Sequence, residues 1–194
     1  MDYLKRYLNG EHQQVWEELD ALGPEVRREP HYSAAKAVAA ETMRRVQRNC
    51  ALIVSRLESL GYQFGVYPDG SRGYISTSPL AALTPDSESA LDELNQIAGP
   101  LPLSLEAFWR QVGSVDFVGR LAGWPLGLDP LVVHPPEGAL FDVEDGYPVD
   151  DEGRFDAGLA PDDLHKDNIS GGSPYSCLLY TSPSPRDRTR SRMP

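Results

Sequence analysis

The chain has 194 residues and a formal net charge of -11, with 18 Lys and Arg against 29 Asp and Glu. This length suits about one domain, and 40% hydrophobic residues are enough for a core. An acidic surface disfavours nucleic acid and membranes, because both need cationic side chains for neutralisation. No apolar run approaches the ~20 residues of a membrane span, and residues 1–14 lack the apolar segment of a signal peptide. Cys50 and Cys177 are too few for a disulfide framework, so we expect a cytoplasmic protein.

Residues 1–61 predict a helical N-terminal module. Helices are expected at Asp2–Leu8, at Glu11–Leu22 and, after an N-cap at Ser33, through Leu60. The long helix carries one apolar seam, formed by Ala35, Ala39, Met43, Val46, Cys50, Ile53, Leu57 and Leu60. This spacing is compatible with dimerisation as a coiled coil. It also suits packing on the preceding helix, which we favour because the seam spans only about three heptads.

Residues 62–176 predict an α+β domain with a mixed sheet flanked by helices. Short apolar runs alternate with amphipathic segments and with glycine or proline stops. The expected elements are a strand at Tyr62–Phe64, a hairpin or loop at Gly65–Pro79, a helix at Ser87–Ala98 begun by Thr84-Pro85, a helix at Ser104–Val112, a strand at 115–118, an apolar and central strand at Leu131–Val133 and a helical turn at Gly138–Glu144. Phe108 and Trp109 are expected in the core.

An acidic, glycine-rich stretch at Asp142–Asp156 predicts a solvated loop. Its candidate partner-binding residues are Asp142, Glu144, Asp145, Asp150, Asp151 and Glu152. The stretch lacks the spacing of an EF-hand, so we expect no calcium site. No Walker loop or dinucleotide-binding glycine fingerprint occurs either, and we expect no cofactor.

A second polar group, Asp162, Asp163 and His165, supplies the residue types of a metal-dependent enzyme or of an acid–base pair. All three lie on one short polar segment, and this sequence pattern does not show that they converge in space. No histidine pairs in sequence with a nucleophile, and we expect no catalytic residues. A hydrolase or metal-dependent enzyme using these three residues remains an alternative.

Residues 177–194 differ from everything before them. The segment CLLYTSPSPRDRTRSRMP has four Arg and one Asp and no periodic apolar face, which is typical of a disordered basic tail. One reading frame of a transposase-type sequencing-library adapter also encodes Cys177–Asp187, and the frame continues into Ser191–Pro194. We therefore expect an artefactual or disordered tail and a natural C-terminus that is missing beyond Ser176.

The stretch LPLSLEAFWRQVG, at Leu101–Gly113, and the strand that follows a Trp-bearing loop resemble the SUKH superfamily. That group includes fungal Smi/Knr-type cell-wall regulators and many bacterial immunity proteins. The second glycine of the family's usual Gly-Gly turn is replaced by Ser114. The resemblance covers roughly residues 85–176 and implies an α+β fold and a non-enzymatic binding module.

In some SUKH members the binding module neutralises a toxin by direct contact. An acidic protein of this class suits a basic toxin, because opposite electrostatic fields speed association. The sequence therefore predicts a cytoplasmic protein-binding module, an immunity protein being one such role. A helical scaffold that dimerises through residues 35–60 is a further alternative.

Overall fold

The computed structural model describes residues 2–66, 78–123, 131–144 and 159. Its elements in chain order are α1 (Tyr3–Leu8), α2 (His12–Ala21), the 3-10 helix η1 (Gly23–Arg27), α3 (His31–Ser59), β1 (Tyr62–Phe64), β2 (Leu80–Ala81), α4 (Pro85–Ile97), α5 (Leu103–Gln111), β3 (Ser114–Asp116), β4 (Gly119–Leu121), β5 (Val132–Val133) and α6 (Pro136–Glu144). Small antiparallel sheets are flanked by helices, and the N-terminal region is helical. The predicted α+β class is confirmed.

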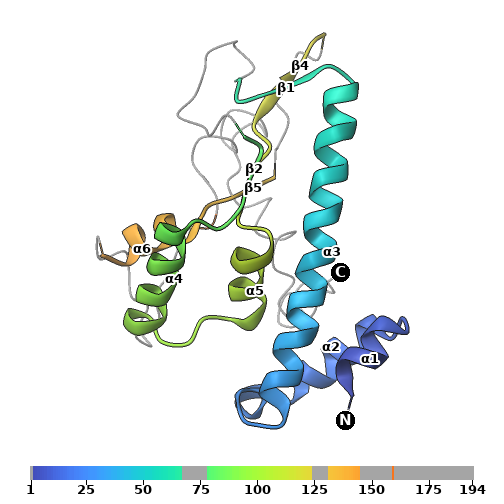
Figure 1. The fold of residues 1–194 in the computed structure, drawn as a ribbon, viewed down its shortest axis with the longest axis vertical. Helices are drawn as coiled ribbons and strands as arrows, with labels where there is room; N and C mark the ends of the chain where they lie inside the picture. The colour runs from blue at the N-terminus through green and yellow to red at the C-terminus, as the bar shows by residue number, and fades with distance from the viewer. Residues whose placement is uncertain (1, 67–77, 124–130, 145–158, 160–194) are drawn as a thin grey trace, which may run out of the picture.

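Helix α3 runs along one side of the molecule, and α1 and α2 pack at its N-terminal end (Figure 1). With 29 residues, α3 is about 43 Å long at 1.5 Å per residue. The aromatic and aliphatic side chains of α1 and α2 form one core with the first turns of α3, where Ala35 and Val38 are buried. This packing is what an amphipathic helix requires to bury its apolar stripe.

Over most of its length, the predicted apolar seam of α3 packs against other elements of the same chain. Cys50, with Met43 and Val46 beside it, packs against Val112 and Val115 from the region that follows. Burial raises the pKa of the Cys50 thiol, which suits its predicted role as a small buried hydrophobe. The last seam residues differ: Ile53 is 41% exposed and Leu60 is 69% exposed.

Two small antiparallel sheets lie beside the C-terminal half of α3. One pairs β1 with β4, and the other has the order β2-β3-β5. The Tyr62 hydroxyl donates a 2.8 Å hydrogen bond to the Phe117 carbonyl and links the two sheets. Within the three-stranded sheet β3 lies between β2 and β5, and β5 pairs with β3 on one side. The His134 N–H, directly after β5, donates a 2.8 Å hydrogen bond to the Leu159 carbonyl. The residues on either side of Leu159 lie outside the described part of the chain, so the central position of Leu131–Val133 stays a prediction.

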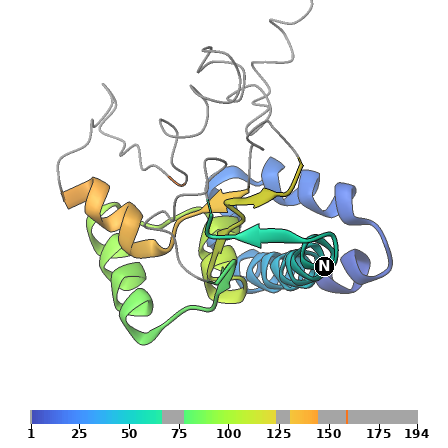
Figure 2. The ribbon, with the colours of Figure 1, turned by 90° about the horizontal axis from the view of Figure 1, so that it is seen from above.

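Helices α4 and α6 lie side by side on the side of α5 away from α3 (Figure 2). α5 packs on α3, and α6 packs on α4. Gly113 ends α5 with φ +84°, and a Cβ there would lie 2.0 Å from the Ala81 carbonyl oxygen of β2. Only glycine allows this approach between the helix end and the sheet.

The predicted helix boundaries are close to those observed, but the predicted N-cap of α3 is wrong. α3 begins before Ser33, whose hydroxyl donates to the Glu29 carboxylate instead. The N-cap residue of α5 is Pro102. At the end of α4, Ile97 is 44% exposed.

Candidate functional site

Helix α4 presents four carboxylates to solvent, and its sequence explains why. The Thr84 hydroxyl accepts a 3.1 Å hydrogen bond from the Ser87 amide, and Pro85 occupies the first turn. These features start a helix efficiently. Leu91 and Leu94 are almost fully buried, so the polar positions must point away from the core. The exposed carboxylates are Asp86, Glu88, Asp92 and Glu93.

Helix α5 anchors this arrangement through Trp109. The indole is 1% exposed, and its Nε1–H donates a 2.9 Å hydrogen bond to the His134 carbonyl, just before α6. Trp109 also packs with Leu91 of α4 and with Ala139 of α6. One aromatic side chain therefore fixes three helices relative to one another, which confirms the prediction that Trp109 lies in the core.

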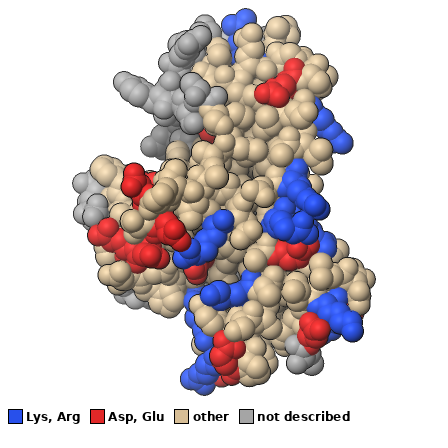
Figure 3. All heavy atoms as spheres, in the orientation of Figure 1, with Lys and Arg blue, Asp and Glu red and all other residues tan. Residues whose placement is uncertain are grey.

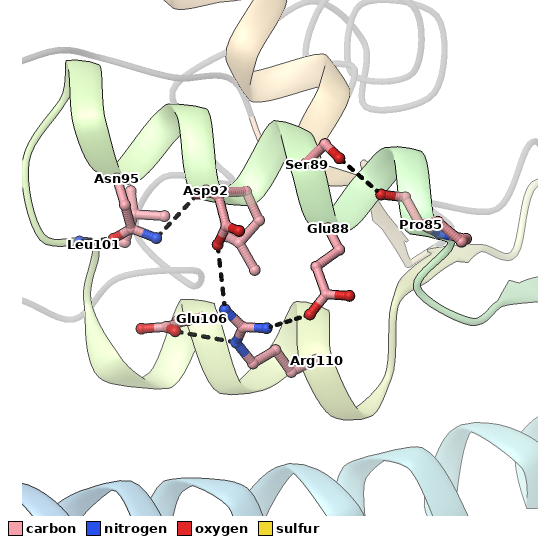
Figure 4. A network of polar contacts seen from close by, with 9 residues as sticks. Pro85, Glu88, Ser89, Asp92, Asn95, Leu101, Glu106 and Arg110 are labelled. Atoms are coloured by element: carbon pink, nitrogen blue, oxygen red, sulfur yellow. Dashed lines mark hydrogen bonds and ion pairs between the residues drawn. The ribbon is translucent and has the colours of Figure 1, made fainter.

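Arg110 is the single cationic side chain of α4, α5 and α6. Figure 4 shows its guanidinium between three carboxylates, 3.1 Å from Glu88, 3.7 Å from Asp92 and 3.1 Å from Glu106. Partial burial acts to lower the pKa of Arg110, but hydrogen bonds to Glu106 and Glu88 outweigh it and raise that pKa. One cation facing three anions leaves this junction between α4 and α5 negative.

Helix α6 extends the negative surface beside α4. The Ser87 hydroxyl donates a 2.5 Å hydrogen bond to one Glu137 oxygen, which joins the N-terminal turns of α4 and α6. Asp142 is partly buried in the last turns of α6. Phe141, on the same helix, is 65% exposed.

We call helices α4, α5 and α6 together the acidic layer. They contain one cation, Arg110, against eight carboxylates, which are Asp86, Glu88, Asp92, Glu93, Glu106, Glu137, Asp142 and Glu144. Figure 3 shows carboxylates gathered over α4 and α6, on the left side of that view. Like charges at this density repel one another, so a cationic partner would be attracted to this surface.

The ion pairs of the N-terminal helices are arranged differently. Arg6 donates to Glu11 at 2.8 Å and to both oxygens of Glu18 at 2.7 Å. These hydrogen bonds raise the pKa of Arg6 and lower that of Glu18. Glu41 accepts from Arg44 and Arg45, which lowers the pKa of Glu41 to about 2. In these ion pairs each carboxylate faces at least one cation.

The structure describes two of the six predicted partner-binding residues. Asp142 and Glu144 belong to α6 and not to a loop, so the predicted solvated loop is wrong for these residues. The remaining candidates, Asp145, Asp150, Asp151 and Glu152, lie outside the described residues, as do Asp162, Asp163 and His165. The α4 carboxylates were missed, although four acidic and no basic residues in one amphipathic helix are a visible signal.

A hollow lies between α3 and α5. Its lining is mostly alanine and aliphatic side chain with a charged rim, formed by Lys36, Ala39, Ala40, Leu103, Glu106, Ala107, Arg110 and Gln111. Its volume is about 70 Å³, against roughly 300 Å³ or more for typical small-molecule sites. Within the described ranges no three His, Cys, Asp or Glu side chains group as metal ligands. Among those same residues no helix is long and apolar enough to cross a membrane.

Comparison with known proteins gave no match. No protein-family model fits the chain, and neither the curated proteins nor the solved structures contain a significant relative.

Proposed function

We propose that this chain is a non-enzymatic, cytoplasmic protein-binding module whose acidic layer docks a basic protein. The observation that carries the proposal is the imbalance of eight carboxylates to one arginine on three helices held by one buried tryptophan. A rigid surface of one charge sign steers an oppositely charged partner and speeds encounter.

The SUKH-like stretch at Leu101–Gly113 supports the same proposal. It forms α5 and its terminal glycine, the helix that carries Trp109 and Arg110. Immunity proteins of that superfamily bind toxins directly, and a basic toxin is the partner that the charge of this surface would suit. Phe141, 65% exposed on α6, supplies the kind of apolar anchor on which interfaces depend.

The experiment uses a matched pair of neutralised variants. The acidic-layer variant combines Asp86→Asn, Glu88→Gln, Asp92→Asn and Glu93→Gln. The control variant removes the same number of exposed carboxylates elsewhere, through Glu17→Gln, Asp20→Asn, Glu25→Gln and Glu58→Gln. The tagged chain and both variants are purified from cells that also express the neighbouring genes, and the proteins retained are identified and quantified by mass spectrometry.

We expect wild type and the control variant to retain one basic protein at equal yield and the acidic-layer variant to lose about nine-tenths of it. Equal retention by both variants would show that the acidic layer is not the docking surface. Retention of an acidic protein through this layer would contradict the proposal outright.

A further inference from the structure

The second half of α3 has a side that no described element covers. Positions seven apart lie on the same side of a helix, and Val38, Arg45 and Leu52 follow this spacing. Val38 is buried under α1 and α2. At Arg45 that cover ends, where the guanidinium lies 2.7 Å from His12 Nε2 and over the Tyr7 ring. Leu52 is 54% exposed.

We call this uncovered side the α3 outer face. It consists of Arg48, Leu52, Ile53, Arg56 and Leu60. Its aliphatic members are 54%, 41% and 69% exposed, and in Figure 3 the upper part of the molecule, where this half of α3 lies, carries few charged side chains. Successive members of one row on this face are four residues apart, in the order Arg48, Leu52, Arg56 and Leu60. Arginine and leucine therefore alternate along the helix surface.

The two arginines of this face are not neutralised within the described part of the chain. Neither the Arg48 nor the Arg56 guanidinium has a carboxylate partner there, whereas Arg6, Arg28, Arg44, Arg45 and Arg110 all do. The nearest carboxylate along α3 is Glu58, which lies about 200° around the helix from Arg56. Lys5, Arg27, Lys36 and Arg120 also lack a carboxylate partner among the described residues, but the α3 outer face combines two such cations with exposed aliphatic side chains and contains no carboxylate.

We propose that the α3 outer face docks an acidic amphipathic helix of a partner protein. Arg48 and Arg56 are about 12 Å apart along the helix axis, at 1.5 Å per residue. A partner helix lying along this row would place carboxylates seven or eight residues apart against them. Its apolar positions, spaced by three and four, would cover Leu52, Ile53 and Leu60.

Two other occupants fit this surface less well. A second copy of α3, paired through the same face, would bring its own Arg48 and Arg56 to the two arginines already there. An anionic membrane would attract these cations, but it would repel the acidic layer of the same rigid molecule. The charge pattern therefore favours an acidic helix.

Binding is measured by fluorescence anisotropy with two labelled model peptides of about 14 residues. Both peptides carry leucine at helical spacing. The Glu peptide has Glu at the positions that flank the leucines, and the Lys peptide has Lys at those same positions. We expect the full chain to bind the Glu peptide about tenfold more tightly than the Lys peptide, with affinity falling as salt rises.

Two double variants are used, Leu52→Ser with Ile53→Ser and Arg48→Gln with Arg56→Gln. Each should weaken the binding of the Glu peptide about fivefold or more. The control is Leu8→Ser, at a leucine that is 53% exposed on α1, and it should leave the binding affinity unchanged. Because all five altered side chains are exposed, folding is checked by an unchanged thermal melt. Equal binding of both peptides would overturn the proposal, as would unchanged binding by both double variants.

Two further outcomes would also overturn the proposal. One is a molecular mass of the wild type that rises with protein concentration, together with a lower mass for the Leu52→Ser, Ile53→Ser variant. That result would identify a second copy of the chain as the occupant of this face. The other is binding to vesicles containing anionic lipid that is lost in the Arg48→Gln, Arg56→Gln variant, which would identify a membrane. The acidic-layer variant keeps the α3 outer face intact. The two proposals are therefore tested separately, and failure of the basic-partner proposal does not decide the acidic-helix proposal.

Discussion

The helices before residue 61 and the acidic layer use their charges in opposite ways. Through residue 66 the chain has nine carboxylates, at Asp2, Glu11, Glu17, Glu18, Asp20, Glu25, Glu29, Glu41 and Glu58. It has nine cations, at Lys5, Arg6, Arg27, Arg28, Lys36, Arg44, Arg45, Arg48 and Arg56. The acidic layer has eight carboxylates and one cation.

The N-terminal helices hold several internal ion pairs, whereas the acidic layer carries an excess of one charge sign. In the N-terminal helices most arginines pair with carboxylates on the same or the adjacent helix. In the acidic layer Arg110 pairs with three carboxylates and is the one cation on these helices. Like charges at this density cost some stability by repulsion, and the proposed function accounts for a surface that keeps them. The predictions below test this comparison.

The largest effect is expected where the acidic layer joins the rest of the molecule. Gly113→Ala places a Cβ 2.0 Å from the Ala81 carbonyl oxygen at a φ of +84°. We expect a loss of more than about 3 kcal/mol in the free energy of unfolding, because backbone clash adds to conformational strain. Gly99→Ala is the control: its φ is +79° with nothing within 4 Å, so the loss should be about 1 kcal/mol. Equal losses in chemical denaturation would show that the joint is not tightly packed.

A smaller effect is expected when the acidic layer loses its cation. Arg110→Gln leaves Glu88, Asp92 and Glu106 facing one another, and we expect a loss of about 1 kcal/mol at low salt. Added salt should reduce this loss, since it screens repulsion between the carboxylates. Arg28→Gln is the control, because this side chain is 74% exposed and pairs only with Glu25; it should change stability by less than about 0.5 kcal/mol. An Arg110→Gln loss that grows with salt would contradict the account.

The smallest effect is a pH dependence in the N-terminal helices. Arg44 and Arg45 lower the pKa of Glu41 to about 2, against about 4.3 for an unfolded chain. The stability contributed by ionised Glu41 is therefore present above about pH 4.3 and is lost as the pH falls toward 2. Wild type and Glu41→Gln should differ in unfolding free energy above this window and converge within it. A difference that is constant from pH 6 to about pH 2.5 would refute this assignment.

The sequence predicted the α-helices and β1, because their signals are local, but it did not predict η1, β2 or β4. The apolar spacing of α3, the Thr84-Pro85 start of α4 and the glycine after α5 all predict what is observed. Sheet position is not local: the order β2-β3-β5 joins residues far apart in the chain, and the spacing within one strand does not reveal it. The Arg110 network depends on the packing of α4 against α5, which residue spacing does not reveal.

The acidic surface predicted from the sequence and the acidic layer overlap at Asp142 and Glu144 of α6. The sequence indicated an acidic binding surface at Asp142–Asp156, and the structure adds the α4 carboxylates, which are more than forty residues earlier in the chain. They adjoin α6 because Leu91 and Leu94 share a core with Ala139 and Val143. A surface assembled from separate helices is seen only once the helices are packed.

The central claim is that the acidic layer attracts a basic protein, and the most direct test is the association rate of that protein. The rate constant would be measured by stopped flow from about 20 to about 300 mM salt, for wild type, the acidic-layer variant and the control variant. We predict a fall of about tenfold or more for wild type and for the control variant, and a slow, nearly salt-independent rate for the acidic-layer variant. The same salt dependence in all three proteins would contradict the claim.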